Sequence, residues 1–307
     1  MIAALAGGVG AARFLDGLAR VIPPKDIFVI GNTGDDAEIH GLHVSPDLDT
    51  VTYTLAGLAD PVRGWGLRGD TFHNLEALRR LGAETWFQLG DRDLATHIFR
   101  TERMRNGAKL SEVTREINAA LGVKSTIVPM SDDPVRTLVQ TKTQVLEFQD
   151  YFVRRRARDS VRGLLFYGSE QARPAPGVLD AIMRADALIF CPSNPLISIG
   201  PILSLPGVRQ ALERRGGHTV AISPIVGGRA LKGPAAKMMR GLKLSASAFG
   251  VAELYQGLAN VFVLDNEDET AASKIESLGM KVVVTDTIMS SLSKKKALAR
   301  TAMKAVE

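Results

Sequence analysis

The sequence predicts an α/β protein in which helices cover both faces of a mostly parallel sheet. Short apolar runs recur between helical patterns, as in chains built from strand–helix–strand units. The first two runs each end in a loop of glycine and small polar residues, which suits phosphate and sugar. Of the 307 residues, 45% are hydrophobic, enough for a large core.

The predicted strands are seven short runs rich in β-branched and aliphatic residues. They are Ile2–Ala6, Ile27–Ile30, Leu164–Tyr167, Ala187–Cys191, Thr219–Ser223, Val261–Leu264 and Lys281–Thr285. Runs of this length between helical patterns indicate parallel strands buried on both faces. We therefore expect a Rossmann-like, three-layer core.

The middle of the chain departs from this rhythm. From about residue 51 to residue 149 helical patterns dominate, for example Phe72, Leu75, Leu78 and Leu81 before Gly82. No linker rich in glycine, serine or proline separates this stretch. We expect a single domain over 1–307, with a core from 1–50 and 150–307 and a largely helical insertion at about 51–149 that forms one wall of the site.

Composition limits the partners and the location. The net charge is +5, but the basic residues are spread along the chain. The clusters Arg154–Arg158 and Lys294–Lys296 carry no interleaved aromatic residues, so we interpret them as solvated faces and expect no nucleic-acid partner. The only cysteine, Cys191, follows an apolar run and is predicted to be buried. No signal peptide or membrane span is evident, so a cytoplasmic location is expected.

The turn Gly7-Gly8-Val9-Gly10 follows the first predicted strand and opens a helix. Glycines let backbone N–H groups approach an anion, and the positive end of the helix points to the same place. A dinucleotide redox cofactor is disfavoured because Arg13 replaces a small residue and because Asn32 stands where an acid should bind ribose. A phosphate-binding turn remains the prediction.

Three acidic turns could carry chemistry. The first, Ser45–Thr50, contains Asp47 and Asp49; the second, Gly90–His97, contains Asp91; the third is Met130–Pro134. Carboxylates so spaced can bind Mg²⁺ or take a proton from a hydroxyl. Helix caps, ion pairs and ordinary turns explain the same residues equally well.

Two loops in the second half also follow predicted strands. Cys191–Pro195 offers Ser193 and Asn194, and Ser223–Pro234 offers Gly228 with Arg229 or Lys232 for a phosphate. Ligands of open α/β sheets bind at the carboxyl ends of the strands. We expect these loops and the glycine turn to form one large polar site.

Five motifs in order resemble the 2-phospho-L-lactate transferase family of coenzyme F420 biosynthesis. They are Gly7–Gly10, Ser45–Val51, Leu89–His97, Pro129–Pro134 and Pro192–Pro195, and the resemblance continues through Ile199–Ile202 and Gly250–Glu253. It runs over almost the whole chain.

The resemblance implies an enzyme that moves a phospholactate or phosphoenolpyruvate-type group from a guanosine-diphosphate-activated donor. The acceptor is the terminal ribityl hydroxyl of Fo (7,8-didemethyl-8-hydroxy-5-deazariboflavin). The products are GMP and F420-0 or dehydro-F420-0, and Mg²⁺ assists. A homodimer is implied as well, and we expect no membrane partner. In-line displacement at phosphorus depends on positioning and charge neutralisation, which fits a site without a serine or cysteine nucleophile.

The resemblance also implies roles for individual residues. Gln88 stands where some relatives carry lysine, so it can hydrogen-bond Fo but adds no charge. The expected roles are catalysis by Asp47 and Asp49; Fo binding by Asp49, Gln88 and Asp91; nucleotide binding by Gly8, Gly10, Asn32, Ser193, Asn194 and Gly228; and Mg²⁺ binding by Asp36, Asp47 and Asp49.

Two other functions compete with this interpretation. A sister family on the same scaffold resembles a nucleotide-sugar-binding regulator of carbon metabolism, and a dehydrogenase ranks third. The Asp47–Asp49 and Asp91 loops favour the transferase. The sequence leaves open whether the donor carries phospholactate, phosphoenolpyruvate or phosphoglycerate.

Overall fold

A seven-stranded, all-parallel sheet forms the centre of the computed structural model, which describes residues 1–215, 218–231 and 233–306. The strand order is β14-β13-β10-β9-β1-β2-β5. The bounds are β1 Ile2–Ala6, β2 Ile27–Gly31, β5 Thr126–Pro129, β9 Ala187–Phe190, β10 Thr219–Ile222, β13 Val261–Asp265 and β14 Lys281–Thr285. Six of the seven predicted runs are strands of this sheet.

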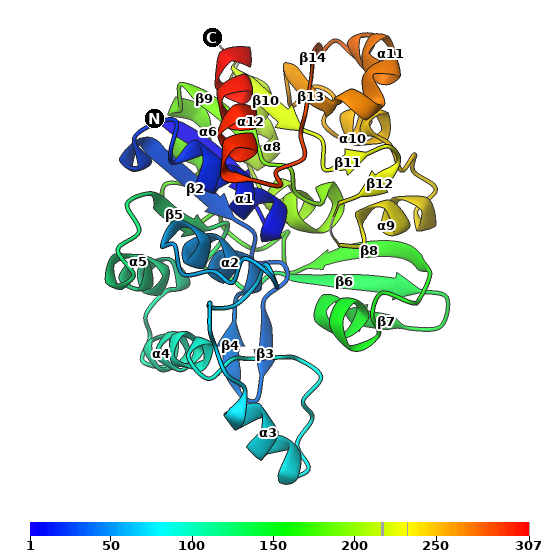
Figure 1. The fold of residues 1–307 in the computed structure, drawn as a ribbon. Coiled ribbons are helices and arrows are strands. Elements are labelled where there is room, and N and C mark those ends of the chain that lie inside the picture. Colours follow the sequence, from blue (N-terminus) through cyan, green and yellow to red (C-terminus); the bar gives the residue numbers. More distant parts are fainter. Residues whose placement is uncertain (216–217, 232, 307) are drawn as a thin grey trace.

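Two hydrophobic clusters cover the two faces of the sheet. In β1, Ala3 and Leu5 face one cluster, while Ile2 and Ala4 face the other. One face carries α1 Gly8–Leu18, α2 Pro46–Leu55, α5 Leu110–Ala120 and α12 Leu292–Ala305. The other carries α6 Val178–Arg184, α7 Gly200–Ser204, α8 Val208–Arg214, α9 Ala235–Gly241, α10 Ala248–Leu254 and α11 Ala272–Glu276. The predicted three-layer, Rossmann-like core is confirmed (Figure 1).

The seventh predicted run, Leu164–Tyr167, does not join the parallel sheet. It belongs to β8 Val161–Tyr167, which pairs antiparallel with β6 Arg136–Thr141, while β6 also pairs with β7 Val145–Glu147. Leu164 and Phe166 pack on the core, whereas Leu165 and Tyr167 are exposed. A strand with one solvent-exposed face is typical of antiparallel sheets, so the prediction that this run belongs to the parallel sheet was wrong.

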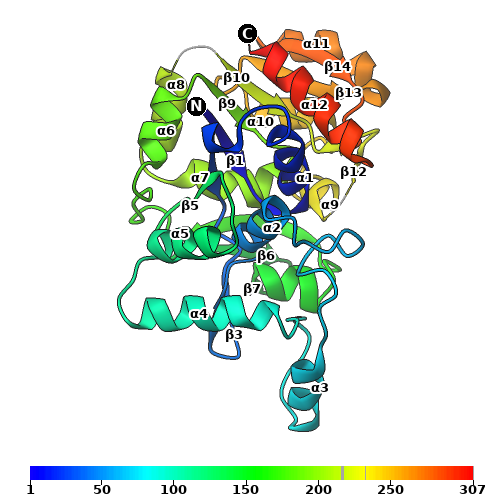
Figure 2. The ribbon, with the colours of Figure 1, turned by 60° about the vertical axis from the view of Figure 1, so that its left-hand side comes forward.

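The stretch 51–149 contributes both helices and strands. It holds the end of α2, then α3 His73–Arg80, α4 Asp93–Arg105 and α5, but also β6, β7 and the edge strand β5 of the central sheet. The hairpin of β3 Ala37–Ile39 and β4 Leu42–Val44 packs against α4 through a small cluster of its own. Helix α3, which buries only Leu75, projects away from the central sheet (Figures 1 and 2).

The remaining elements are short. They are the hairpin of β11 Ile225–Val226 and β12 Arg229–Ala230, the 3₁₀ turns Pro24–Asp26 and Asn266–Ala271, and the π turns Asp150–Arg154 and Pro195–Ile199. Within the described part of the chain, no helix has the length and apolar character needed to cross a bilayer.

Candidate functional site

A cavity of about 960 Å³ opens where β1 and β9 lie side by side. From β1 the sheet continues through β2 in one direction and through β9 in the other, so the order of strands reverses here. Ser193, after β9, joins the two strand ends: its hydroxyl donates to the carbonyl of Gly7 (2.9 Å) and accepts from the Gly7 N–H (3.3 Å). Crevices at such switch points are the usual ligand sites of open α/β sheets.

The glycine turn brings α1 unusually close to its neighbours. A Cβ at Gly10 would overlap the carbonyl oxygen of Pro192, and one at Gly7 would lie 2.5 Å from Asp47 Oδ2. Gly8 has φ +68°, which disfavours other residues. The backbone N–H of Gly8 hydrogen-bonds Asp47. Glycine at these positions therefore allows close packing at the cavity floor, in addition to the approach of an anion that the sequence predicts.

Asp47 lies at the start of α2, after Pro46, and its carboxylate faces the cavity. Asn32 Nδ2 donates to its Oδ2 (2.9 Å). Burial raises the pKa of Asp47 to about 7, and the neighbouring charge of Asp36 adds to the rise, although the hydrogen bond from Asn32 opposes it. A buried carboxyl with a raised pKa can bind a cation or take up a proton near neutral pH.

Asp35 is a second buried acid on the cavity wall, and the sequence analysis overlooked it. Burial raises its pKa well above the usual value, and Asp47 contributes the next largest effect. Its Oδ1 has no hydrogen-bond partner among the described residues. Asp35 and Asp36 are adjacent in the sequence, and the residues alone do not indicate which one faces the cavity.

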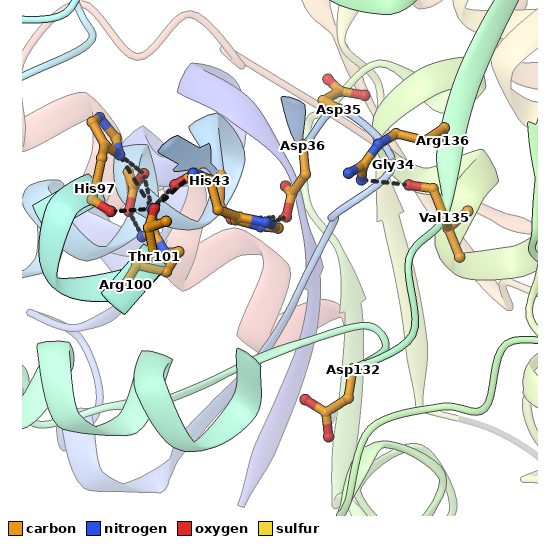
Figure 3. Close-up of polar contacts among 12 residues, drawn as sticks. Gly34, Asp35, Asp36, His43, His97, Arg100, Thr101, Asp132, Val135 and Arg136 are labelled. Carbon is orange, nitrogen blue, oxygen red and sulfur yellow. Dashed lines mark hydrogen bonds and ion pairs between the residues drawn. The ribbon is translucent and has the colours of Figure 1, made fainter. Parts of the chain in front are cut away.

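Asp36, a predicted metal ligand, points elsewhere and does not line the cavity. Its Oδ2 accepts from Ser45 Oγ (2.7 Å) and lies 2.9 Å from His43 Nε2. Figure 3 shows Asp36 directed toward His43 and Asp35 turned the other way.

Asp49 lines the cavity but is bound by Arg100, a fully buried residue of α4. Both terminal nitrogens of the guanidinium donate to the carboxylate, one of them over 3.1 Å. Burial alone would lower the pKa of Arg100, but the charge and hydrogen bonds of Asp49 outweigh it and raise that pKa. Arg100 therefore fixes the orientation of the Asp49 carboxylate, and each of its oxygens still has room for one further hydrogen bond.

His97 extends this buried network. Its Nδ1 lies 3.3 Å from Arg100 Nη1, and because an arginine N–H only donates, Nδ1 is the acceptor in this contact. Nε2 lies 3.3 Å from Asp93 Oδ1, and the same carboxylate oxygen accepts a hydrogen bond from the hydroxyl of Tyr53 (2.6 Å). Figure 3 shows His97 and Arg100 side by side on α4. Sequence spacing across residues 49–100 gave no signal for this arrangement.

Aromatic side chains form the outer wall of the cavity: Trp65, Trp86, Phe87, Phe148 and Phe152. Phe148 and Phe152 stack with ring centroids 5.4 Å apart. The guanidinium of Arg154 lies 5.7 Å from the centre of the Trp86 ring. Such a wall suits a flat, apolar ring system.

Seven predicted site residues line the cavity together. They are Gly8, Gly10, Asp47, Asp49, Gln88, Ser193 and Asn194. Asn32 lies behind them, where it holds Asp47 and donates to the carbonyl of Ile197 (3.2 Å). Asp36, Asp91 and Gly228 are not part of the lining.

Asp91 instead anchors the start of α3. It accepts from Thr71 Oγ1 (2.6 Å) and from the backbone N–H groups of His73 and Asn74 (both 2.9 Å). Gly228 lies in the tight turn between β11 and β12, and Arg229 beside it is exposed. Lys232 lies outside the described residues.

The fold and the cavity define the class: a Rossmann-like α/β protein with an acid-rich cavity at the switch point of its sheet. The family model of 2-phospho-L-lactate transferase CofD matches residues 2–304. The chain therefore belongs to the 2-phospho-L-lactate transferase family, and it is a transferase.

Named relatives agree with this assignment. A 2-phospho-L-lactate transferase of Methanosarcina mazei is 41% identical over 97% of this chain and 98% of its own length. A phosphoenolpyruvate transferase of Streptomyces griseus is 43% identical over 100% of this chain and 98% of its own length. The crystal structure of a UPF0052 family protein from Bacillus halodurans has TM-score 0.62 and 15% identity over 98% of both chains. That last likeness shows the fold alone.

Proposed function

We propose that the protein transfers a phospholactate-type or phosphoenolpyruvate-type group from a guanosine-diphosphate-activated donor to the terminal ribityl hydroxyl of Fo. The products are GMP and F420-0 or dehydro-F420-0. The observation that carries the proposal is one cavity in which buried carboxyls, the glycine turn and an aromatic wall meet. We propose that the enzyme works in the cytoplasm and, as the resemblance implies, as a homodimer.

The donor occupies the side of the cavity formed by the glycine turn. There the N-terminus of α1 and the loop with Ser193 and Asn194 offer backbone and side-chain donors. Arg13, which also lines the cavity, supplies a positive charge for the diphosphate.

Fo occupies the opposite side, with its deazaflavin ring against the aromatic wall. Gln88 hydrogen-bonds a ring or chain oxygen. Asp49, fixed by Arg100, accepts a hydrogen bond from the ribityl chain and orients the attacking hydroxyl.

Magnesium fits the two buried acids on the cavity wall. Asp35 and Asp47 both face the cavity, and Asp35 Oδ1 lacks a partner among the described residues. The described residues hold no ready-made set of three or more acidic, histidine or cysteine ligands. Mg²⁺ commonly takes one or two carboxylates plus substrate phosphates and water, so two acids suffice. When bound, the ion would neutralise charge on the reacting phosphate.

In the reaction, the ribityl oxygen forms a bond to the donor phosphorus that carries the lactate-type group, and the bond from that phosphorus to the GMP oxygen breaks. Asp49 holds the hydroxyl in line during the attack. The hydroxyl proton leaves on the released GMP phosphate, whose second pKa is about 6.

The test is to incubate the protein with Fo, Mg²⁺ and each guanylylated donor in turn, and to identify the products by mass spectrometry. One donor should give a product heavier than Fo by the transferred group, together with GMP. Absence of product with every donor would refute the transferase proposal. Co-elution of yellow, fluorescent Fo with the protein separates this enzyme from a nucleotide-sugar-binding regulator.

Asp49→Asn tests the role of the acceptor-side acid. We expect turnover to fall by roughly two to three orders of magnitude, because orientation of the hydroxyl is lost. Wild-type turnover with unchanged Mg²⁺ dependence in this variant would exclude Asp49 from the mechanism.

A further inference from the structure

Four arginines among the described residues line the cavity: Arg13, Arg63, Arg154 and Arg156. Two of them already have partners. Arg63 donates to Asp60 Oδ2 (3.0 Å), and Arg154 pairs with Glu84 and with Asp150 (3.5 Å). An anionic ligand could recruit either of them only in competition with these contacts.

The other two arginines are Arg13 and Arg156, and the guanidinium of neither has a hydrogen-bond or ion-pair partner among the described residues. Arg13 stands on α1, three residues after Gly10, on the side that we assign to the diphosphate. Arg156 comes from a different part of the cavity wall, the segment that follows β7. The cavity therefore presents two uncommitted cations on separate elements.

The segment carrying Arg156 borders both the acids and the acceptor side. Gln149 Nε2 donates to the carbonyl of Asp35 (2.9 Å), which ties the segment to the proposed magnesium site. Phe148 and Phe152 of the same segment belong to the aromatic wall. Arg156 thus follows a segment that contacts both the backbone of Asp35 and the aromatic wall.

The backbone holds Arg156 in an uncommon conformation. Arg156 has φ +54° and Ala157 has φ +49°, a left-handed region that side chains other than glycine rarely adopt. The turn is fixed by Ala157 N–H donating to the carbonyl of Tyr151 (2.8 Å) and by Lys237 Nζ donating to the carbonyls of Ala157 and Arg158, the latter over 2.8 Å. Its shape is set by the fold.

We propose that Arg156 binds the carboxylate of the transferred group and so selects donors that carry one. The inference rests on the proposed function. A donor of that class has two anionic parts, the diphosphate and the carboxylate, and the carboxylate travels with the group that passes to the acceptor. The diphosphate meets Arg13 and the magnesium site. The planar guanidinium of Arg156 matches a carboxylate with two parallel hydrogen bonds.

The test compares Arg156→Gln and Arg156→Lys with Arg158→Gln. Arg158 is an exposed neighbour that does not line the cavity, so it is the matched control for loss of one charge. Each variant is assayed with the donor that the wild type uses and with a donor in which ethanol replaces lactate, so that the carboxylate is missing.

With the carboxylated donor, Arg156→Gln should raise the donor KM by roughly 10- to 100-fold, because a charge-assisted hydrogen bond is lost. The donor KM of Arg156→Lys should lie between those of the wild type and Arg156→Gln. With the ethanol donor, wild type and Arg156→Gln should have equal kcat/KM. The Fo KM and the activity of Arg158→Gln should stay at wild-type values.

Three outcomes would overturn the assignment: an unchanged donor KM in Arg156→Gln, an equal penalty on both donors, or a rise only in the Fo KM. The last would place Arg156 on the acceptor. If the wild type turns over no donor, the proposed function fails instead, so the two failures are distinguishable. Circular dichroism and Tm of each variant report whether the fold is intact.

Discussion

Replacing Arg100 with methionine should make the stability of the protein strongly pH-dependent, because it leaves Asp49 buried without its counter-charge. Asp49 is 5% exposed and Arg100 is 2% exposed. Removing one partner of a buried pair typically destabilises by about 3–5 kcal/mol. Methionine keeps much of the volume and removes the charge.

The loss of stability in Arg100→Met cannot exceed the free energy needed to protonate Asp49, because the neutral acid needs no counter-charge. For a carboxyl with an ordinary pKa of about 3.9, taking up a proton costs about 1.4 kcal/mol per pH unit above that value, so about 4 kcal/mol at pH 7 and about 1.5 kcal/mol at pH 5. A buried carboxyl without a counter-charge binds a proton more readily in the folded variant than in the unfolded chain, so stability is lost as pH rises. We expect the deficit of Arg100→Met to shrink by about 2–3 kcal/mol from pH 7 to pH 5.

Urea unfolding of wild type and variant at pH 5, 6 and 7 measures this deficit. The double variant Arg100→Met, Asp49→Asn carries no unpaired carboxylate, so its deficit should not vary with pH. A deficit of Arg100→Met that is equal at pH 5 and pH 7 would refute the reasoning and assign the whole effect to lost packing.

Three further predictions concern the cavity floor and α3. Burial raises the pKa of Asp47 to about 7, so without a metal ion this carboxyl keeps its proton in the folded protein at pH values where the unfolded chain has already released it. In EDTA, the free energy of unfolding should therefore fall by about 2 kcal/mol from pH 5 to pH 7. Adding Mg²⁺, or the substitution Asp47→Asn, should make this pH dependence smaller in urea titrations. A pH dependence equal to that of the wild type in EDTA would contradict the prediction. Gly10→Ala should lower the Tm, because its Cβ overlaps the Pro192 carbonyl and overpacking costs at least roughly 1–3 kcal/mol of unfolding free energy; an unchanged Tm would contradict this prediction. Asp91→Ala should speed hydrogen exchange in α3 alone, and unaltered exchange there would show that its three hydrogen bonds do not hold that helix.

Local patterns were sufficient for much of the architecture. Continuous apolar runs such as Val261–Leu264 can be buried only between two layers, so they predicted parallel strands correctly. The run Leu164–Tyr167 looks the same over four residues, yet it has one exposed face in an antiparallel sheet. The edge strand β5 was hidden because it follows a helix in a stretch of helical pattern. Periodicity over so few residues does not distinguish these cases.

The candidate site also contains features that could be predicted from the sequence and features that could not. Glycine turns and strand-end loops are local features, so Gly10, Ser193 and Asp47 could be selected from the chain, and the parallel sheet then brings them to one edge. Asp35 and Asp36 are neighbours in sequence, and only the direction of the backbone decides which one faces the cavity.

The sequence by itself determined the layers, the family and the glycine and acidic loops that meet at the switch point. Tertiary structure alone decided the state of each acid. Arg100 is 51 residues from Asp49, yet it binds that carboxylate through both terminal nitrogens, while burial raises the pKa values of Asp35 and Asp47. Charge states depend on burial and on distances between atoms that are far apart in the chain, and these exist only once the chain has folded.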